Sequence, residues 1–194
     1  GNWWGCQTLG MKPTTISAAK QLTAAYAPLG AVLVPEQIYQ ACLDNSAAAG
    51  TFGHGFTYGG HPLGCALGVK AIEIYQKRDI LGRVRALTPL FEARLKRISE
   101  HPLVGETRFC GLVGGAELVA DKATKRPFDA KKGVAAQLSR FVENHGAILR
   151  SLGDTIAFCP PMIITEAELN ELFDRFELAL ADTEAWVHKE GLRG

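Results

Sequence analysis

A single lysine stands between two short apolar stretches near the start of the chain. Lys20 follows the β-branched residues 14–16 and the small residues 17–19, and it precedes the apolar run 31–34. Both runs favour strands, and the second is typical of a strand buried on both faces. Burial disfavours the ammonium form, lowers the lysine pKa and frees an amine that can condense with a carbonyl. The alternative is a lysine at a strand end whose stem packs on alanines while its ammonium reaches water.

A second candidate is the threonine of a glycine-rich loop that leads into a predicted helix. Residues 57–62 read Thr-Tyr-Gly-Gly-His-Pro, and apolar residues at helical spacing follow. A helix start offers unpaired N–H groups and a positive dipole end, and the Thr57 hydroxyl adds a donor, so a phosphate fits this loop. The loop lacks the P-loop lysine and the dinucleotide glycine spacing. A loop that needs glycine only for turning is therefore an open alternative.

Arg150 is the third candidate, placed by the pattern at the end of a short strand and before a Leu-Gly-Asp turn. An arginine that points from a strand end into a cleft can bind a carboxylate with two parallel hydrogen bonds. Taken alone, Arg150 fits a surface residue better. Its interest comes from the lysine and threonine segments that precede it.

Composition narrows the possible partners. The 194 residues carry a formal net charge of +1, without a long block of like charges, which argues against nucleic acid or an anionic membrane as a main partner. No apolar run is long enough to span a bilayer. The cysteines and histidines show no metal-ligand spacing, which predicts no metal site. Widely spaced cysteines, odd in number, predict a cytoplasmic protein with free and mostly buried thiols.

Apolar spacing and turn signals divide the chain into three parts. Residues 1–78 are predicted to be the tail of an α/β domain, with a helix over 36–43, a long polar loop over 44–61 and a helix that starts near Pro62. Residues 79–99 have apolar side chains every three or four positions and are predicted to form a connector helix.

The third part, residues 100–194, is predicted to be a small α+β domain. Strands are expected over 103–108, 112–119, 147–150 and 155–158, and an amphipathic helix over 132–145. Thr165 and Glu168 form a capping-box pattern, which predicts the start of a final helix that runs to about residue 189.

Taken together, four segments resemble the class III aminotransferases, which are fold-type I, pyridoxal-phosphate-dependent enzymes. They are residues 15–34, 54–62, 146–154 and 158–162, in that order, and the ω-amino acid:pyruvate transaminases are the most similar branch. The likeness runs from residue 1 to about residue 188. It implies that residues 1–78 end the large cofactor-binding domain, and that the connector helix and a small C-terminal domain follow.

The resemblance also implies roles for the three candidates. Lys20 would form the Schiff base with pyridoxal 5'-phosphate. Thr57 would bind the cofactor phosphate of the neighbouring subunit, in a homodimer that shares its active sites, and Arg150 would bind the substrate carboxylate. The implied reaction transfers an amino group from an amine or ω-amino acid to pyruvate or another keto acid. Gln21 and Ala25 stand where this family commonly has glycine, and each would narrow the site or alter a turn.

In this family the aspartate that pairs with the cofactor's pyridine nitrogen lies in the upstream half. The resemblance therefore implies that this chain is a C-terminal part of a whole enzyme, and we expect little activity from it in isolation. Two alternatives stay open. One is a truncated remnant that dimerises without catalysis, and the other is a different pyridoxal-phosphate reaction on the same fold, such as that of an aminomutase, a decarboxylase or a racemase.

Overall fold

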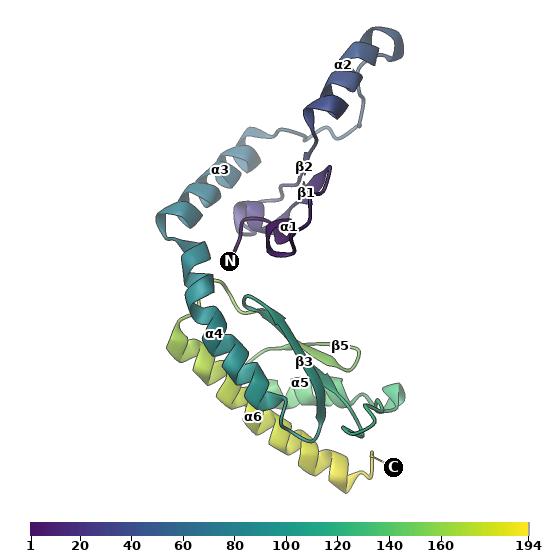
Figure 1. Ribbon diagram of the computed structural model, residues 1–194, viewed down its shortest axis with the longest axis vertical. Coiled ribbons are helices and arrows are strands. Elements are labelled where there is room, and N and C mark those ends of the chain that lie inside the picture. The colour runs from purple at the N-terminus through teal and green to yellow at the C-terminus, as the bar shows by residue number, and fades with distance from the viewer. Residues whose placement is uncertain (194) are drawn as a thin grey trace. The chain divides into compact units, whose positions relative to one another are not determined.

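The computed structural model describes residues 1–193, and these form two units (Figure 1). The N-terminal unit is Asn2–Leu81, and the C-terminal unit begins at Gly82 and includes Gly1. The predicted mixture of helices and strands is confirmed. Within residues 1–193, none of the helices combines the length and apolarity that crossing a bilayer requires.

The N-terminal unit is a two-stranded ribbon with helices before, between and after its strands. Its elements are α1 (Gly5–Thr8), β1 (Ile16–Ala18), the 3-10 helix η1 (Lys20–Thr23), β2 (Ala31–Leu33), α2 (Glu36–Ala49) and α3 (Pro62–Lys77). The strands pair antiparallel, with Ser17 opposite Val32. Helix α2 continues beyond the predicted end at residue 43, because alanines favour a helix and Gln40 bonds Asp44 one turn later at 2.7 Å.

The prediction that β2 is buried on both faces is wrong. All three residues of β2 are exposed, and Val32 keeps 67% of its surface open. A strand is covered on both faces only when other layers pack on it, and no third strand pairs with this ribbon within residues 1–193. The apolar run therefore predicted the strand correctly but predicted its burial wrongly.

The prediction of mostly buried thiols is also wrong. All five cysteines are free, and Cys6 is half-buried, whereas Cys42, Cys65, Cys110 and Cys159 are exposed. Cys42 and Cys65 lie on α2 and α3, whose outer faces no other described element covers. The number and spacing of cysteines predicted their pairing state but not their burial.

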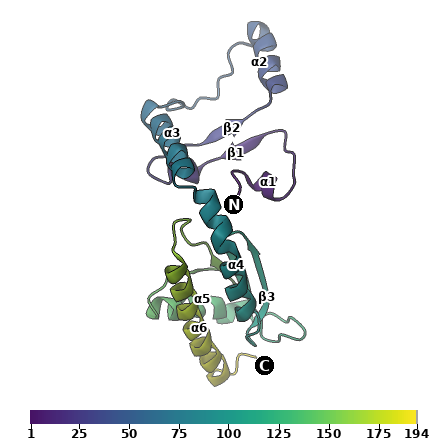
Figure 2. The same ribbon diagram turned by 60° about the vertical axis from the view of Figure 1, so that its left-hand side comes forward.

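Helix α3 packs on η1. Figure 2 shows α3 together with the β1–β2 ribbon. The buried positions of α3 are Gly64, Gly68 and Ala71, whereas the larger Leu63 and Ile74 of the predicted apolar stripe are exposed. A Cβ added at Gly68 would lie 2.7 Å from Leu29 Cδ2 and 3.5 Å from the Leu22 carbonyl oxygen. Glycine therefore allows the helix to approach the η1 turn closely.

The C-terminal unit is an antiparallel sheet with helices on one face. Its elements are the rest of α4 (Ile80–Ile98), β3 (Val104–Cys110), β4 (Val113–Leu118), the 3-10 helix η2 (Ala130–Lys132), α5 (Val134–Asn144), β5 (Arg150–Leu152), β6 (Thr155–Phe158) and α6 (Glu166–Lys189). The strand order is β3-β4-β6-β5. Apart from η2, which was not predicted, these elements match the predicted ones in order and type. The predicted capping box is confirmed, since Thr165 Oγ1 accepts from the Glu168 N–H at 3.2 Å and Glu168 Oε2 accepts from the Thr165 N–H at 2.8 Å.

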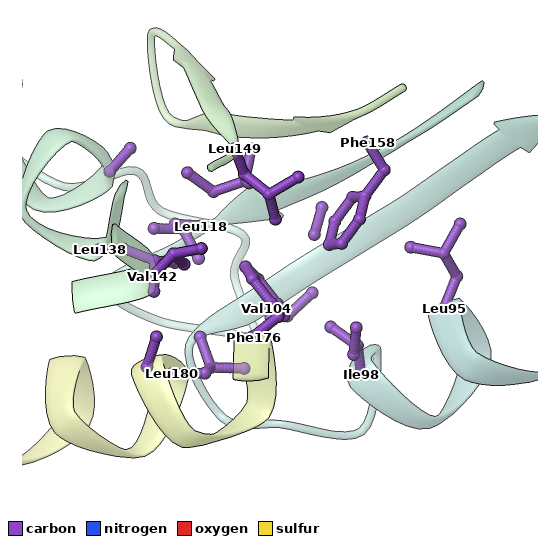
Figure 3. Packing of buried hydrophobic residues seen from close by; sticks show 14 of the residues in the cluster. Leu95, Ile98, Val104, Leu118, Leu138, Val142, Leu149, Phe158, Phe176 and Leu180 are labelled. Carbon is purple, nitrogen blue, oxygen red and sulfur yellow. The ribbon is translucent and has the colours of Figure 1, made fainter. Parts of the chain in front are cut away.

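One hydrophobic core lies between the sheet and the three long helices of this unit (Figure 3). Leu95 and Ile98 come from α4, and Phe176 and Leu180 from α6, and all point toward Phe158 and its neighbours on the sheet. The Phe158 ring stacks on Phe173 at 5.1 Å between ring centres. Buried aromatic rings contribute large apolar areas, so this cluster is the main source of stability of the unit.

Candidate functional site

Lys20 lies on the turn that joins the two strands of the ribbon. It is the first residue of η1, two residues after β1 ends, and the small residues Ser17, Ala18 and Ala19 precede it. The predicted burial of this lysine is wrong, because Lys20 is exposed and no described element covers this side of the ribbon. Its ammonium makes no hydrogen bond or ion pair with any residue among 1–193. The amine is therefore open to a ligand.

The backbone of this turn is held in an uncommon conformation. Lys20, Ala24 and Ala25 have φ angles of +54°, +50° and +63°, in the left-handed region that non-glycine residues rarely adopt. Each such residue costs on the order of 1–3 kcal/mol and persists only where its surroundings hold it. The class III aminotransferases commonly have glycine at the position of Ala25. The positive φ explains this preference, because glycine adopts such angles without strain. Conformations of this kind concentrate at functional sites.

Local hydrogen bonds close the turn on itself. The Ala24 N–H donates to the Gln21 carbonyl and the Ala25 N–H to the Lys20 carbonyl, both at 3.3 Å. Thr23, which is 2% exposed, donates its hydroxyl to the Ala27 carbonyl at 2.6 Å. These bonds hold the Lys20 carbonyl and the residues that follow it, while the Lys20 side chain makes no such bond within residues 1–193.

Thr57 lies in a turn directly before α3. The Gly59 N–H donates to the Phe56 carbonyl at 2.9 Å, and the His61 side chain caps the helix by accepting from the Leu63 N–H at 3.3 Å. Gly60 has a φ of +70°, so the turn itself requires a glycine there. Thr57 is exposed, and its hydroxyl has no hydrogen-bond partner in the part of the chain that the structure describes.

The predicted place of Arg150 at the end of a strand is wrong, because Arg150 is the first of the three residues of β5. The sequence pattern put the strand over 147–150, but the hairpin pairs Leu152 with Thr155, which fixes β5 around the turn. The pairing of the strands also determines which residues lie beside Arg150 on the sheet. Arg150 stands opposite Ala157, and Ala157 stands opposite Gly115.

The row continues to Arg108, which stands opposite Gly115 on the far strand. Its guanidinium donates to Glu106 at 3.1 Å and to Glu117 at 3.2 Å, so its charge is balanced on the sheet. The Arg150 guanidinium makes no such bond within residues 1–193 and is exposed. Gly115 and Ala157 therefore separate Arg108, whose charge is paired with two glutamates, from Arg150, whose charge is unpaired within residues 1–193. The sequence did not predict this row, because the register of the strands alone brings its members together.

The three side chains supply the donor set that an aldehyde-bearing, phosphorylated cofactor and a carboxylate substrate need. Lys20 offers a primary amine, Thr57 a hydroxyl beside a helix start, and Arg150 a guanidinium. Lys20 and Thr57 belong to the N-terminal unit and Arg150 to the C-terminal unit. By chemistry, Lys20 and Thr57 of the N-terminal unit fit the aldehyde and the phosphate of pyridoxal phosphate, Arg150 fits a carboxylate, and each polar group is free for a ligand within residues 1–193.

Comparison with known proteins gives a consistent result. The sequence profile described as "Aminotransferase class-III" matches residues 1–180. "Gamma aminobutyrate transaminase 3, chloroplastic" of Solanum lycopersicum is 39% identical over 189 residues, which are 97% of this chain and 36% of that protein. A probable gamma-aminobutyrate transaminase 3, mitochondrial, of Oryza sativa subsp. indica is 39% identical over 184 residues, 95% of this chain and 36% of that protein.

Solved structures agree in fold. A crystal structure titled as an omega-transferase from Vibrio fluvialis JS17 superposes with a TM-score of 0.91 at 41% identity, covering 96% of this chain and 44% of that one. An omega-aminotransferase from Paracoccus denitrificans gives a TM-score of 0.92 at 41% identity, covering 96% and 41%. The chain spans less than half the length of these relatives and aligns to their C-terminal part.

Proposed function

Since this chain belongs to the class-III aminotransferase family, we propose that it carries the lysine, a phosphate contact and the carboxylate-binding arginine of a pyridoxal-phosphate-dependent transaminase. The observation that carries the proposal is that Lys20, Thr57 and Arg150 are all exposed and free of partners within residues 1–193. Because no other protein group within residues 1–193 engages these three side chains, each is available to a ligand. The left-handed backbone at Lys20 gives independent support.

In this proposal each residue has one task. Lys20 Nζ would hold the cofactor through the cofactor's aldehyde carbon, with release of water, and as a free amine it would accept a proton from the donor carbon. Bound pyridoxal phosphate supplies an electron sink for that step. Thr57 Oγ1 and the start of α3 hold the phosphate, and the Arg150 guanidinium holds the carboxylate of the keto acid.

The charges beside Arg150 favour an acceptor with one carboxylate. Arg108 is already bonded to Glu106 and Glu117, so within this row of the sheet Arg150 offers the unbalanced positive charge. A single guanidinium matches a single carboxylate with two parallel hydrogen bonds. We therefore propose pyruvate or a similar keto acid as acceptor, with an amine or ω-amino acid as donor.

Cofactor attachment tests the lysine directly. We would incubate the 194-residue chain with pyridoxal phosphate, reduce it with borohydride and map the labelled peptide. The expected label is on Lys20, absent in Lys20→Ala and retained in Lys12→Ala, which removes another exposed lysine from the same segment. A label spread over both lysines, or none at all, would contradict the proposal and favour a non-catalytic remnant.

Activity is best tested in a chimera that joins this chain to the N-terminal part of the Paracoccus denitrificans ω-aminotransferase, with that intact enzyme as the positive control. Lys20→Ala should lower kcat by about 10²- to 10⁴-fold. Arg150→Gln should raise the KM for pyruvate by about tenfold to a hundredfold, since a charged hydrogen bond is lost. The KM for an amine donor without a carboxylate should not change. Equal effects on both substrates would remove Arg150 from this role.

We also propose that the protein is a homodimer in which Thr57 serves the neighbouring subunit, and that it is cytoplasmic. Helix α2 supports the dimer, because none of its residues is buried although Ile38, Tyr39 and Leu43 are apolar or aromatic. Exposed apolar surface of this kind marks interaction sites. The free cysteines are compatible with a reducing compartment.

Mixed dimers test the shared site. In the chimera, a Lys20→Ala subunit and a Thr57→Val subunit should each have low activity. Each mixed dimer should have about half of the normal activity, because one of its two sites receives an intact lysine and an intact threonine, so a randomly mixed sample should regain about a quarter. If both residues served the same subunit, no mixed dimer would contain an intact site and mixing would restore nothing.

A further inference from the structure

A tyrosine on α3 reaches the residue that follows Lys20. The Tyr75 hydroxyl donates to the Gln21 carbonyl oxygen at 2.8 Å, across 54 positions in the sequence. The same carbonyl accepts from the Ala24 N–H at 3.3 Å. Gln21 is therefore held from two directions, once from inside the turn and once from the helix that packs on it.

This hydrogen bond adds to the packing of α3 on η1, which is otherwise made by apolar contacts. Gly68 lets α3 approach the turn closely, since a Cβ at this position would lie 2.7 Å from Leu29 Cδ2 and would require that side-chain tip to shift. Thr23 bonds only within the turn, to Ala27. The Tyr75 hydroxyl thus adds a directed bond to a helix contact that is otherwise made by small apolar residues, and directed bonds fix orientation where small apolar contacts do not.

The turn needs such a restraint. Lys20, Ala24 and Ala25 all have positive φ angles, and unrestrained non-glycine residues leave that region for more populated ones. A change of φ at Lys20 would swing its Cα–Cβ bond and carry the amine away with it. The direction of the Lys20 side chain therefore depends on what holds the backbone at Gln21 and Ala24.

We propose that Tyr75 is a positioning residue for Lys20: its hydroxyl, through the Gln21 carbonyl, holds the left-handed turn that aims the lysine amine. The proposal rests on the function proposed for Lys20. Burial raises the pKa of the Tyr75 phenol, so the hydroxyl keeps its proton and stays a donor over the range in which a transaminase works.

The matched test is Tyr75→Phe, which keeps the ring and removes the bond, with Tyr39→Phe as control. Tyr39 is exposed on α2 and its hydroxyl has no partner in the described part of the chain. The first readout is amide hydrogen exchange at Ala24 and Ala25, whose N–H groups close the turn. Tyr75→Phe should speed exchange by about threefold to tenfold, the effect of one ordinary hydrogen bond, and Tyr39→Phe should not.

The second readout is the rate at which pyridoxal phosphate becomes fixed to Lys20 by borohydride. It should fall by about threefold to tenfold in Tyr75→Phe and stay unchanged in Tyr39→Phe. Unchanged exchange and unchanged fixation in Tyr75→Phe would overturn the inference. If the unsubstituted chain fixes no cofactor at Lys20, the proposed function fails and the positioning role fails with it. Faster exchange at Ala24 would then support only a structural bond from Tyr75 to the turn.

Discussion

The two units of this protein are held together in different ways. Every member of the hydrophobic cluster, from Val84 to Val187, lies in the C-terminal unit. The buried residues of the N-terminal unit are Thr23, Gly64, Gly68, Ala71 and Ile80, and among them only Ile80, next to the boundary at Leu81, has a large apolar side chain. The C-terminal unit is thus fixed by side-chain packing, and the N-terminal unit by backbone hydrogen bonds and close approach.

This difference matters because the lysine turn belongs to the less buried unit. Segments with few buried apolar contacts open with low free energy, and functional loops are drawn from such segments. The Lys20 turn therefore depends on local hydrogen bonds, such as those of the Thr23 hydroxyl and the Tyr75 hydroxyl, to hold its geometry. Arg150 instead rests on a sheet that its own unit stabilises.

The largest expected effect is on the free energy of unfolding, when a phenylalanine is replaced by alanine in each of the two units. Phe158 is fully buried and packs on Phe173 and Phe176, so Phe158→Ala should lower the free energy of unfolding by about 3–5 kcal/mol. Phe56 is 76% exposed, and Phe56→Ala should cost less than about 0.5 kcal/mol. Urea unfolding followed by circular dichroism measures both. Similar losses would show that the N-terminal unit has a core of its own.

A smaller effect should distinguish rigid from adaptable packing. A Cβ at Gly114 would lie 2.7 Å from Leu95 Cδ1 and 2.8 Å from Phe91 Cε1, inside the core, so Gly114→Ala should cost about 1–3 kcal/mol. At Gly68 the obstacle is the tip of Leu29, which is free to rotate, and alanine favours a helix by about 1 kcal/mol over glycine. Gly68→Ala should be close to neutral. Thermal unfolding of the two variants makes the comparison, and a large loss at Gly68 would show that the α3 contact is as rigid as the core.

The smallest effect concerns pH. Burial lowers the pKa of His101 from its ordinary value of 6.5, although Glu184 lies 3.3 Å away and favours the charged form. A histidine with a lowered pKa binds protons more readily when unfolded, so its contribution to stability is present above pH 6.5 and is lost as the pH falls below it. The urea midpoint of the C-terminal unit should decrease between pH 7.5 and pH 5.5.

The control for that prediction is His101→Asn. In the native protein the Leu103 N–H donates a hydrogen bond to the His101 ring at 3.2 Å. The asparagine side chain can still accept this bond, but it does not titrate. The variant should show a weaker fall of the urea midpoint over the same pH range. An equal fall in both proteins would assign the pH dependence to other groups.

Much of the fold was predictable from local patterns. The capping box at Thr165, the spacing of apolar residues in α4 and α6, and the hairpin turn before Thr155 are encoded within a few residues of each other, so each pattern specified its element. Helix α2 was predicted too short, because alanines and the Gln40–Asp44 bond extend it through residues that read as a polar loop.

The candidate residues were named from sequence because type and order identify a lysine, a threonine and an arginine without any coordinates. Their surroundings were not. The Tyr75 bond and the row from Arg108 to Arg150 join residues that are distant in the chain. The exposure of Lys20 depends on which layers cover the strands, and its positive φ depends on the contacts that hold the turn. Sequence determined which chemical groups this protein offers, and tertiary structure decided how they are held, because burial and strand register are set by partners that no local pattern contains.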